Sequence, residues 1–428
     1  MTNISCILYP PTLDYYYLVQ RPQHLMQSFA RLGINCFYLN NPQPQSKVVR
    51  GIDNVIPNLY LFNNVDPAPY LKDVKPVVYY TSAAQADLVL RYNPSLVIFD
   101  SVDDPSDEFA AWLPFYEKAV STADIVLTTS DKLFARASKL NPSTYLVPNG
   151  CDFEHFSRWD LPVPDDVANI KRPVIGYVGV VATWVDLELV AKLADAFPEY
   201  SIVMVGPLYN VTRVPYRPNI YWMGYKDYKD LPLYVRVFDI GIIPFKQTTM
   251  VEAVNPIKMW EYMASGIPVV STSLPEVQKY GDLIYTAATH EQFIEMVVRA
   301  LAEDSPEKRE KRIFTARQNS WMVRAKQIVK IIEEKLTEKE IKREEKINPS
   351  YVAALAEKIM QDAPQDISYL PAVSGFGGRL KVGRRWRIKL TTWPNLYERG
   401  KVNRFYFSRE LKINIIKGPA FYFRNERG

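Results

Sequence analysis

Short runs of apolar residues alternate with amphipathic stretches along the first 150 residues. The apolar runs span residues 4–10, 35–40, 76–80, 95–100, 125–130 and 144–150. The stretches between them, at 21–33, 107–124 and 131–140, repeat apolar residues every three or four positions, as in a helix with one buried face. Continuous apolar strands that alternate with helices are typical of a parallel sheet covered on both faces. The pattern therefore predicts a doubly wound α/β domain.

The alternation stops at residues 159–173, where proline and acidic residues cluster as in a linker, and then restarts. Further strands are expected at 174–179, 201–207, 219–224, 239–245, 267–272 and 282–287. Further helices are expected at 186–197, 229–238, 256–265 and 290–303. The predicted fold class is α/β, with two doubly wound Rossmann-like domains at 1–165 and 166–320 that face a cleft. A helix at 321–347 is expected to pack back on the domains, and 348–428 is a basic, aromatic extension.

The composition is that of a soluble globular protein, since 47% of the 428 residues are hydrophobic and 23% are charged. The three cysteines, Cys6, Cys36 and Cys151, match neither a disulfide framework nor a zinc spacing, which favours a reducing compartment. The N-terminus lacks the basic and long apolar segments of a secretion signal, and no apolar run approaches the roughly 20 residues that span a bilayer. We therefore expect a cytoplasmic protein.

Positive charge is concentrated at the C-terminus. Residues 379–428 hold 14 Lys plus Arg against three Glu, a net charge of +11, so the other residues carry −6 of the total of +5. Aromatic residues are interleaved with these cations from Trp386 to Phe423. Such a segment suits an anionic membrane surface, here the inner face of the plasma membrane. A purely structural extension that contains a β-hairpin is the main alternative, and nucleic acid is the least favoured partner.

Candidate chemistry is clearest at the start of the helix expected at 256–265. Asn255 suits the N-cap and Pro256 the first helical position. Lys258 lies in the first turn, where a cation is unfavourable for the helix dipole unless an anion is near, and Glu261 follows on the same face. A helix start with a lysine suits a diphosphate, and the carboxylate suits the hydroxyls of a ribose. An exposed ion pair between the two side chains is the alternative.

Seven motifs, spread over about the first 335 residues, give the chain a resemblance to a known family. They are RPQHL (21–25), VPNGCDFEHF (147–156), GYVG (176–179), VGP (205–207), DIGIIPF (239–245), NPIKMWEYMASGIPVVS (255–271) and NSW (319–321). Their order and spacing resemble those of GT-B glycosyltransferases of family 4, and of bacterial enzymes that build envelope polysaccharides such as teichuronic acid.

The resemblance implies a hexosyltransferase-type enzyme with the GT-B fold. The second domain would bind a nucleotide sugar, expected to be a UDP-sugar, and the first a glycan or lipid-linked acceptor, with no metal or cofactor. Glu261 matches the family's ribose-binding glutamate and Lys258 a phosphate contact. Gly179 would let its loop approach the diphosphate, although a glycine there also fits a plain strand-end turn. Asn255 and Tyr262 complete the expected donor site.

The chain departs from the family pattern at Ala253, where the family commonly has a glutamate that contacts the donor sugar. The adjacent Glu252 is the candidate to replace that glutamate. The departure leaves the stereochemical outcome of the transfer open.

Acceptor-side chemistry is expected in the loops of the first domain. Asp100, Asp103 and Asp104 follow a predicted strand, and one of them could take the proton of the acceptor hydroxyl or could cap the next helix. His24, on the first helix, is a further catalytic candidate if it lies near the cleft, and ordinary surface is the alternative. Tyr15 to Tyr17 could stack on sugar rings or pack on their own domain.

Several other classes of protein compete with a glycosyltransferase. A nicotinamide enzyme needs a G-x-G-x-x-G and a P-loop enzyme a G-x-x-x-x-G-K-[ST], and the sequence contains neither motif in the required place. A nucleotide-sugar epimerase or hydrolase of the same fold remains an alternative, as does a non-catalytic glycan-binding or scaffold protein.

Overall fold

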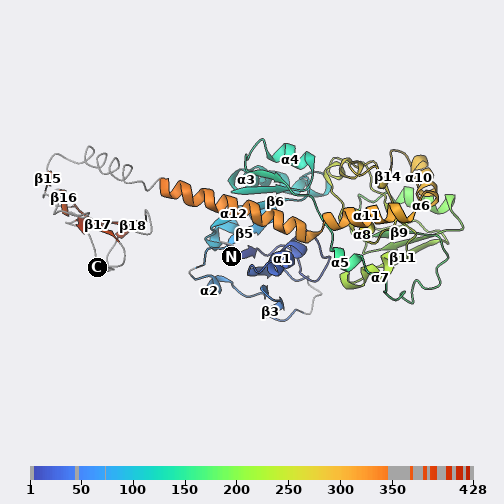
Figure 1. The fold of residues 1–428 in the computed structure, drawn as a ribbon, viewed down its shortest axis with the longest axis horizontal. Coiled ribbons are helices and arrows are strands. Elements are labelled where there is room, and N and C mark those ends of the chain that lie inside the picture. Colours follow the sequence, from blue (N-terminus) through green and yellow to red (C-terminus); the bar gives the residue numbers. More distant parts are fainter. Residues whose placement is uncertain are drawn as a thin grey trace. The chain divides into compact units, whose positions relative to one another are not determined.

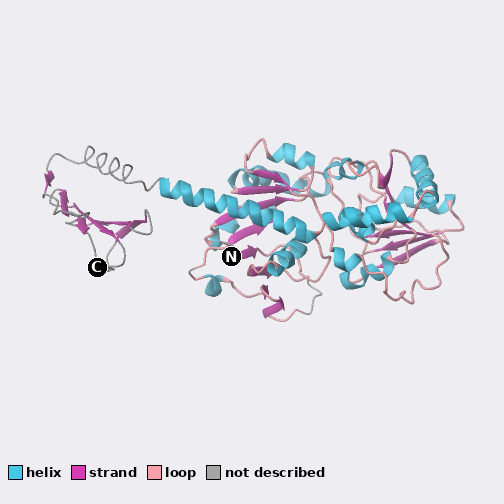
Figure 2. Cartoon of the chain, viewed as in Figure 1, coloured by secondary structure: helices cyan, strands magenta, loops and turns pink. Residues whose placement is uncertain are grey.

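The computed structural model describes residues 4–43, 48–72 and 74–345, with side chains to residue 341, and the backbone of six strands between 367 and 424. The chain divides into two compact units, Met1–Glu333 and Glu334–Gly428. The first unit contains two sheets, each flanked by helices (Figures 1 and 2).

Eight strands form the first sheet, in the order β3-β4-β2-β1-β5-β6-β7-β8. They are β1 (Ile7–Tyr9), β2 (Cys36–Asn40), β3 (Gly51–Ile56), β4 (Leu59–Asn63), β5 (Val77–Tyr80), β6 (Leu96–Ser101), β7 (Ile125–Thr128) and β8 (Thr144–Leu146). All neighbours are parallel except β3 and β4, which form an antiparallel hairpin. The six strands predicted for this domain are present. The hairpin was missed. β3 is a partly exposed edge strand without a continuous apolar run, whereas β4 was missed although residues 59–62 form such a run.

Six parallel strands form the second sheet, in the order β11-β10-β9-β12-β13-β14. They are β9 (Val174–Val178), β10 (Ser201–Val205), β11 (Ile220–Gly224), β12 (Ile240–Ile243), β13 (Val269–Thr272) and β14 (Ile284–Ala287). All six were predicted. The order is that of a Rossmann sheet, and it reverses between β9 and β12. Ligands collect outside the carboxyl ends of the strands at such a switch point.

The helices of the first unit confirm most of the predicted pattern. They are α1 (Arg21–Arg31), α2 (Ala68–Leu71), α3 (Leu113–Thr122), α4 (Asp131–Ala137), α5 (Phe153–Phe156), α6 (Leu187–Ala196), α7 (Leu231–Val235), α8 (Ile257–Ala264), α9 (Pro275–Gln278), α10 (His290–Ala302), α11 (Pro306–Gln318) and the start of α12 (Trp321–Glu345). The helix expected at 107–124 is instead a 3₁₀ segment, Asp107–Trp112, followed by α3. Pro114 sits in the first turn of α3, where its missing N–H costs nothing, so the α-helix starts there.

The start of α12 packs on the first domain, as the sequence predicted. Its apolar residues Trp321, Ile328 and Ile332 are buried. The Gln327 amide donates to the carbonyl of Leu146, and Arg324 donates to the carbonyl of Asn149. The chain therefore passes from the first sheet to the second after β8 and returns through α12 (Figure 1).

The second unit contains a sheet with the order β15-β16-β17-β19-β18, and β20 pairs with β17. Its strands are β15 (Ile367–Tyr369), β16 (Arg379–Val382), β17 (Trp386–Thr392), β18 (Val402–Tyr406), β19 (Leu411–Lys417) and β20 (Phe421–Arg424). β16 and β17 pair antiparallel, as the predicted hairpin requires. Most of the interleaved aromatic residues lie on these strands, whereas Trp393, Tyr397 and Phe407 lie outside the described residues.

Candidate active site

A pocket of about 330 Å³ lies between the carboxyl ends of the two sheets, and we call it the cleft pocket. The first domain contributes loops after β1 and β6, including Gln20 and Asp103. The second contributes the loop after β9, Phe245 after β12 and the first turns of α8. The cleft pocket therefore occupies the switch point of the second sheet, where the topology alone predicts a ligand.

Helix α8 begins one residue later than predicted. Its N-cap is Pro256, without a side-chain cap. The Asn255 side chain is engaged elsewhere, since its Oδ1 accepts from the backbone N–H of Asn149 and its Nδ2 donates to Glu276. The Asn149 amide in turn donates to the Asn255 carbonyl at 2.7 Å. Asn255 thus joins the two domains at the wall of the cleft pocket rather than capping the helix.

Lys258 and Glu261 both line the cleft pocket, as predicted. Glu261 is only 7% exposed, and no described residue forms a side-chain hydrogen bond or ion pair with its carboxylate or with the Lys258 ammonium. The predicted alternative, an exposed ion pair between the two, is therefore absent from the described structure. The Lys258 ammonium lies over the rings of Phe245 and Tyr177, 4.5 and 5.3 Å from their centroids.

Burial shifts both groups toward neutrality. Burial raises the pKa of Glu261 from 4.5 to about 7, against the attraction of Lys258. Burial likewise lowers the pKa of Lys258 from 10.5 to about 8, against the attraction of Glu261. Two charges held in this way without partners are unfavourable for the folded protein, and such sites are typical of ligand binding.

Gly179 is required where it stands, after β9. Its φ is +137°, and a Cβ there would lie 3.0 Å from Lys258 Cε. Its carbonyl also lies against Gly206, where an added Cβ would come within 1.9 Å of that oxygen. The glycines bring the loop after β9 close to Lys258, so the site needs more than a plain strand-end turn.

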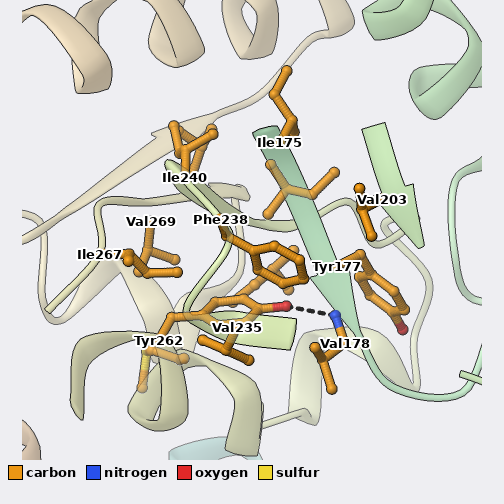
Figure 3. Packing of buried hydrophobic residues seen from close by; sticks show 14 of the residues in the cluster. Ile175, Tyr177, Val178, Val203, Val235, Phe238, Ile240, Tyr262, Ile267 and Val269 are labelled. Carbon is orange, nitrogen blue, oxygen red and sulfur yellow. Dashed lines mark hydrogen bonds between the residues drawn. The ribbon is translucent and has the colours of Figure 1, made fainter. Parts of the chain in front are cut away.

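Tyr262 was predicted to bind the donor, but the structure places it in the core. It is fully buried and its hydroxyl accepts a hydrogen bond of 2.8 Å from the backbone N–H of Val178 (Figure 3). Figure 3 also shows its ring beside Phe238. Consecutive helical residues do not share a face, so Tyr262 turns into the sheet while Glu261 faces the pocket. Tyr262 instead holds the end of β9 in position.

Asp100 was a candidate catalytic base, but it is occupied. Its carboxylate is fully buried and accepts from Arg21, at 2.6 Å from Nε to Oδ2 and 3.1 Å from Nη2 to Oδ1, and also from the Tyr79 hydroxyl. Arg21 further donates to the Pro148 carbonyl and to Asn149 Oδ1, both at 3.2 Å. A buried carboxylate that is bonded on both oxygens holds structure together and has no free face for an acceptor hydroxyl.

The three predicted aspartates divide into separate roles. Asp104 is buried and pairs with Arg136 at 3.3 Å. Asp103 alone lines the cleft pocket, and no described residue pairs with its carboxylate. Burial raises the pKa of Asp103 from 3.8 to about 6, and the neighbouring Asp100 charge adds to the shift. Of the three, Asp103 is therefore the one placed to receive a proton.

His24 does not reach the cleft pocket. It is 3% exposed, its ring stacks on Trp321 with centroids 5.1 Å apart, and its edge meets Tyr228. Burial lowers the pKa of His24 to about 3. His24 lines a different pocket, whose lining includes neither Tyr228 nor Glu261. The structure thus removes His24 from the catalytic candidates.

The three tyrosines after β1, Tyr15 to Tyr17, lie in different environments. Tyr15 is buried and accepts a hydrogen bond from Gln27, so it packs on its own domain. Tyr17 stacks on Tyr225 of the second domain, with centroids 5.1 Å apart. Tyr16 is 54% exposed and remains an untested candidate for sugar stacking.

Glu252 does not line the cleft pocket in place of the family's glutamate. It is exposed and pairs with Lys132 of α4 at 2.8 Å. Ala253 is buried and lies outside the pocket lining. Asn149 was not among the predicted site residues. It lines the cleft pocket and forms hydrogen bonds with both Arg21 and Asn255. Its position inside the VPNG motif was the available signal.

The described residues contain no group of three or more His, Cys, Asp or Glu side chains arranged to hold a metal ion. None of the helices within them combines the length and apolar character required for a bilayer span.

The fold and the cleft between its two sheets define a GT-B architecture of the kind found in glycosyltransferases. Sucrose-phosphate synthase from Thermosynechococcus elongatus superimposes over 77% of this chain and 98% of its own, with a TM-score of 0.59 and 14% identity. Anabaena HepE, solved in complex with UDP and glucose, covers 77% of this chain and 99% of its own, with a TM-score of 0.57 and 14% identity. At these identities the likeness shows the fold, and the predicted fold class is confirmed.

Sequence comparison finds two further similarities. Residues 172–303, which span the second sheet, match the family described as Glycosyl transferases group 1. Over 229 residues the chain is 30% identical to a Bacillus subtilis (strain 168) protein named as the teichuronic acid biosynthesis glycosyltransferase TuaH. That alignment covers 50% of this chain and 57% of the relative, so it spans little more than half of the relative's length. The resemblance expected from the seven motifs is confirmed.

Proposed function

We propose that the chain is a glycosyltransferase that moves a sugar from a UDP-sugar to a glycan or lipid-linked acceptor, in envelope or exopolysaccharide synthesis. The observation that carries the proposal is the pair formed by the half-buried Lys258 and the buried Glu261, which faces the cleft pocket and whose charged groups have no hydrogen-bond or ion-pair partner among the described residues. A nucleoside diphosphate supplies what both lack, an anion for the lysine and hydroxyls for the carboxylate. The match to group 1 transferases and the UDP in the HepE structure support this choice of ligand.

In this proposal Glu261 accepts hydrogen bonds from both ribose hydroxyls. The Lys258 ammonium and the backbone N–H groups around Gly179 and the start of α8 stabilise the diphosphate. That diphosphate leaves with the electron pair of the bond to the anomeric carbon, so the same contacts strengthen as negative charge develops during the reaction. No metal is part of the proposal, because the cation that balances the diphosphate is Lys258.

Asp103 is the proposed general base for the acceptor hydroxyl. The acceptor hydroxyl oxygen attacks the anomeric carbon while its proton passes to the Asp103 carboxylate. A carboxylate with a pKa of about 6 is still ionised near neutral pH and is more basic than an exposed aspartate. Both properties favour it as a base.

The test is UDP release from UDP-sugars in the presence of bacterial envelope glycan or lipid fractions. Asp103→Asn should lower turnover about 100-fold or more, the usual range for a general base, while UDP binding persists. Asp104→Asn is the matched control, because Asp104 pairs with Arg136 away from the pocket. Equal turnover in Asp103→Asn would remove its role. UDP binding without acceptor-dependent release would favour the non-catalytic alternative.

We further propose that the enzyme works in the cytoplasm and that residues 379–428 attach it to the inner face of the plasma membrane. The net charge of +11 and the interleaved aromatic residues support attachment to anionic lipid. Co-sedimentation with anionic vesicles that weakens at high salt is expected, whereas equal binding to neutral vesicles would contradict an electrostatic attachment.

A further inference from the structure

A second pocket, of about 620 Å³, lies at the junction where the chain crosses between the two domains, and we call it the hinge pocket. One face of α1, residues 151–158 and the turn between α11 and α12 line it. The two segments in which the chain crosses between the domains, one after β8 and one between α11 and α12, meet here. The Cys151 N–H donates to the Asn319 carbonyl at 3.2 Å, and the Trp321 N–H donates to the Cys151 carbonyl at 3.0 Å. The hinge pocket is thus framed by segments that pair with each other.

Three arginines from three different segments line the hinge pocket: Arg31, Arg158 and Arg317. None of them forms an ion pair with another described residue, and Arg317 lies 5.2 Å from the centroid of the Phe153 ring. Two carboxylates, Asp152 and Glu154, also line the pocket, so the formal charge of the lining is +1. Guanidinium groups are well suited to bidentate contact with phosphate or carboxylate oxygens.

The inner wall adds buried polar atoms that no described residue satisfies. His24 Nε2 and Trp321 Nε1 both lack a hydrogen-bond partner, and both residues are only 3% exposed. An indole N–H can only donate, and a neutral imidazole donates from one of its nitrogens. Buried polar atoms without partners are rare in native proteins, so these two atoms distinguish this wall from an ordinary protein interior. Helix α12 also starts at this wall, with no acidic residue in its first turn.

We propose that the hinge pocket binds a small molecule through an anionic oxygen group, either a phosphate or a sugar carboxylate. The arginines supply the charge, and a side-chain movement that exposes Trp321 Nε1 would add a neutral hydrogen bond. The pocket volume is in the range of small-molecule sites, which leaves room for a sugar-sized body beside the anionic group. This site shares no lining residue with the cleft pocket, and the proposal does not depend on the glycosyltransferase assignment.

The experiment is calorimetric titration of the full chain with inorganic phosphate and, separately, with glucuronate. The Arg31→Ala/Arg158→Ala double variant should bind the successful probe at least about tenfold more weakly, the loss expected for charge-assisted hydrogen bonds. Both side chains are exposed, so the variant should fold. Arg213→Ala is the matched control, because Arg213 is an exposed arginine outside both pockets. Lys258→Ala tests whether the probe binds in the cleft pocket instead.

Each outcome decides the proposal. Binding of phosphate, of glucuronate or of both that falls in the double variant and persists in Arg213→Ala and Lys258→Ala supports it and identifies the group. Binding that is unchanged in the double variant, or that is lost in Lys258→Ala, would overturn it. The absence of binding by both probes would overturn it as well.

Discussion

The ionisable side chains at the carboxyl ends of the two sheets differ in whether they are paired. On the first sheet, Asp100 is enclosed by Arg21 and Tyr79, with both carboxylate oxygens bonded. On the second, Glu261 and Lys258 have no hydrogen-bond or ion-pair partner among the described residues, and their pKa values are about 7 and 8. The first arrangement stabilises the fold because each buried charge is satisfied, whereas the second is costly until a ligand arrives. A buried ionisable group therefore indicates function only when the chain leaves it unsatisfied.

The largest expected effect is on the first sheet. Arg21→Met would leave the Asp100 carboxylate buried without its cation, and the free energy of unfolding should fall by about 3–5 kcal/mol. Lys258→Met should cause no such loss, because it removes a half-buried charge that has no hydrogen-bond or ion-pair partner among the described residues. Urea unfolding followed by tryptophan fluorescence compares the two. Similar losses in both variants would erase the contrast between the two sheets.

A smaller effect of opposite sign is expected for Glu261→Gln. The folded protein holds the Glu261 proton up to a pH of about 7, whereas the unfolded chain releases it near 4.5, so the carboxylate lowers stability as the pH rises through that window. Removing the charge should raise the free energy of unfolding at pH 8 by up to about 3 kcal/mol, and by about 2 kcal/mol less at pH 5. Thermal melts at the two pH values measure the difference. A variant that is less stable at pH 8 would show that Glu261 is satisfied in the fold.

The affinity for UDP should also depend on pH, and near neutrality the change in binding free energy should be smaller than the stability changes above. Protonation of Glu261 below a pH of about 7 and deprotonation of Lys258 above about 8 each remove one contact of the proposed site. Affinity should peak between these values and fall by up to about tenfold per pH unit outside them. In Glu261→Gln the decline on the acid side should disappear while the decline on the alkaline side remains. A flat profile in the unmodified chain would mean that neither group contacts the nucleotide.

The sequence predicted the architecture well because both sheets are built from continuous apolar strands, and that pattern is local. It predicted Lys258 and Glu261 for a similar reason, since helical spacing fixes which side chains share a face. The outcomes it missed depend on distant partners. Asp100 and Asp103 lie in one short segment, yet Arg21, 79 residues before Asp100, decides which of them is free. Likewise, the packing of Tyr262 against the end of β9 follows from tertiary contacts.

The central claim is that the unsatisfied Lys258–Glu261 pair is a nucleoside diphosphate site, and calorimetric titration with UDP tests it most directly. Glu261→Gln should weaken UDP binding by about 1–3 kcal/mol, roughly a tenfold to hundredfold change, because it loses hydrogen bonds to a charged acceptor. Glu252→Gln should leave the affinity unchanged, since Glu252 pairs with Lys132 outside the pocket. UDP binding that is equally strong in Glu261→Gln and in the unmodified chain would contradict the claim.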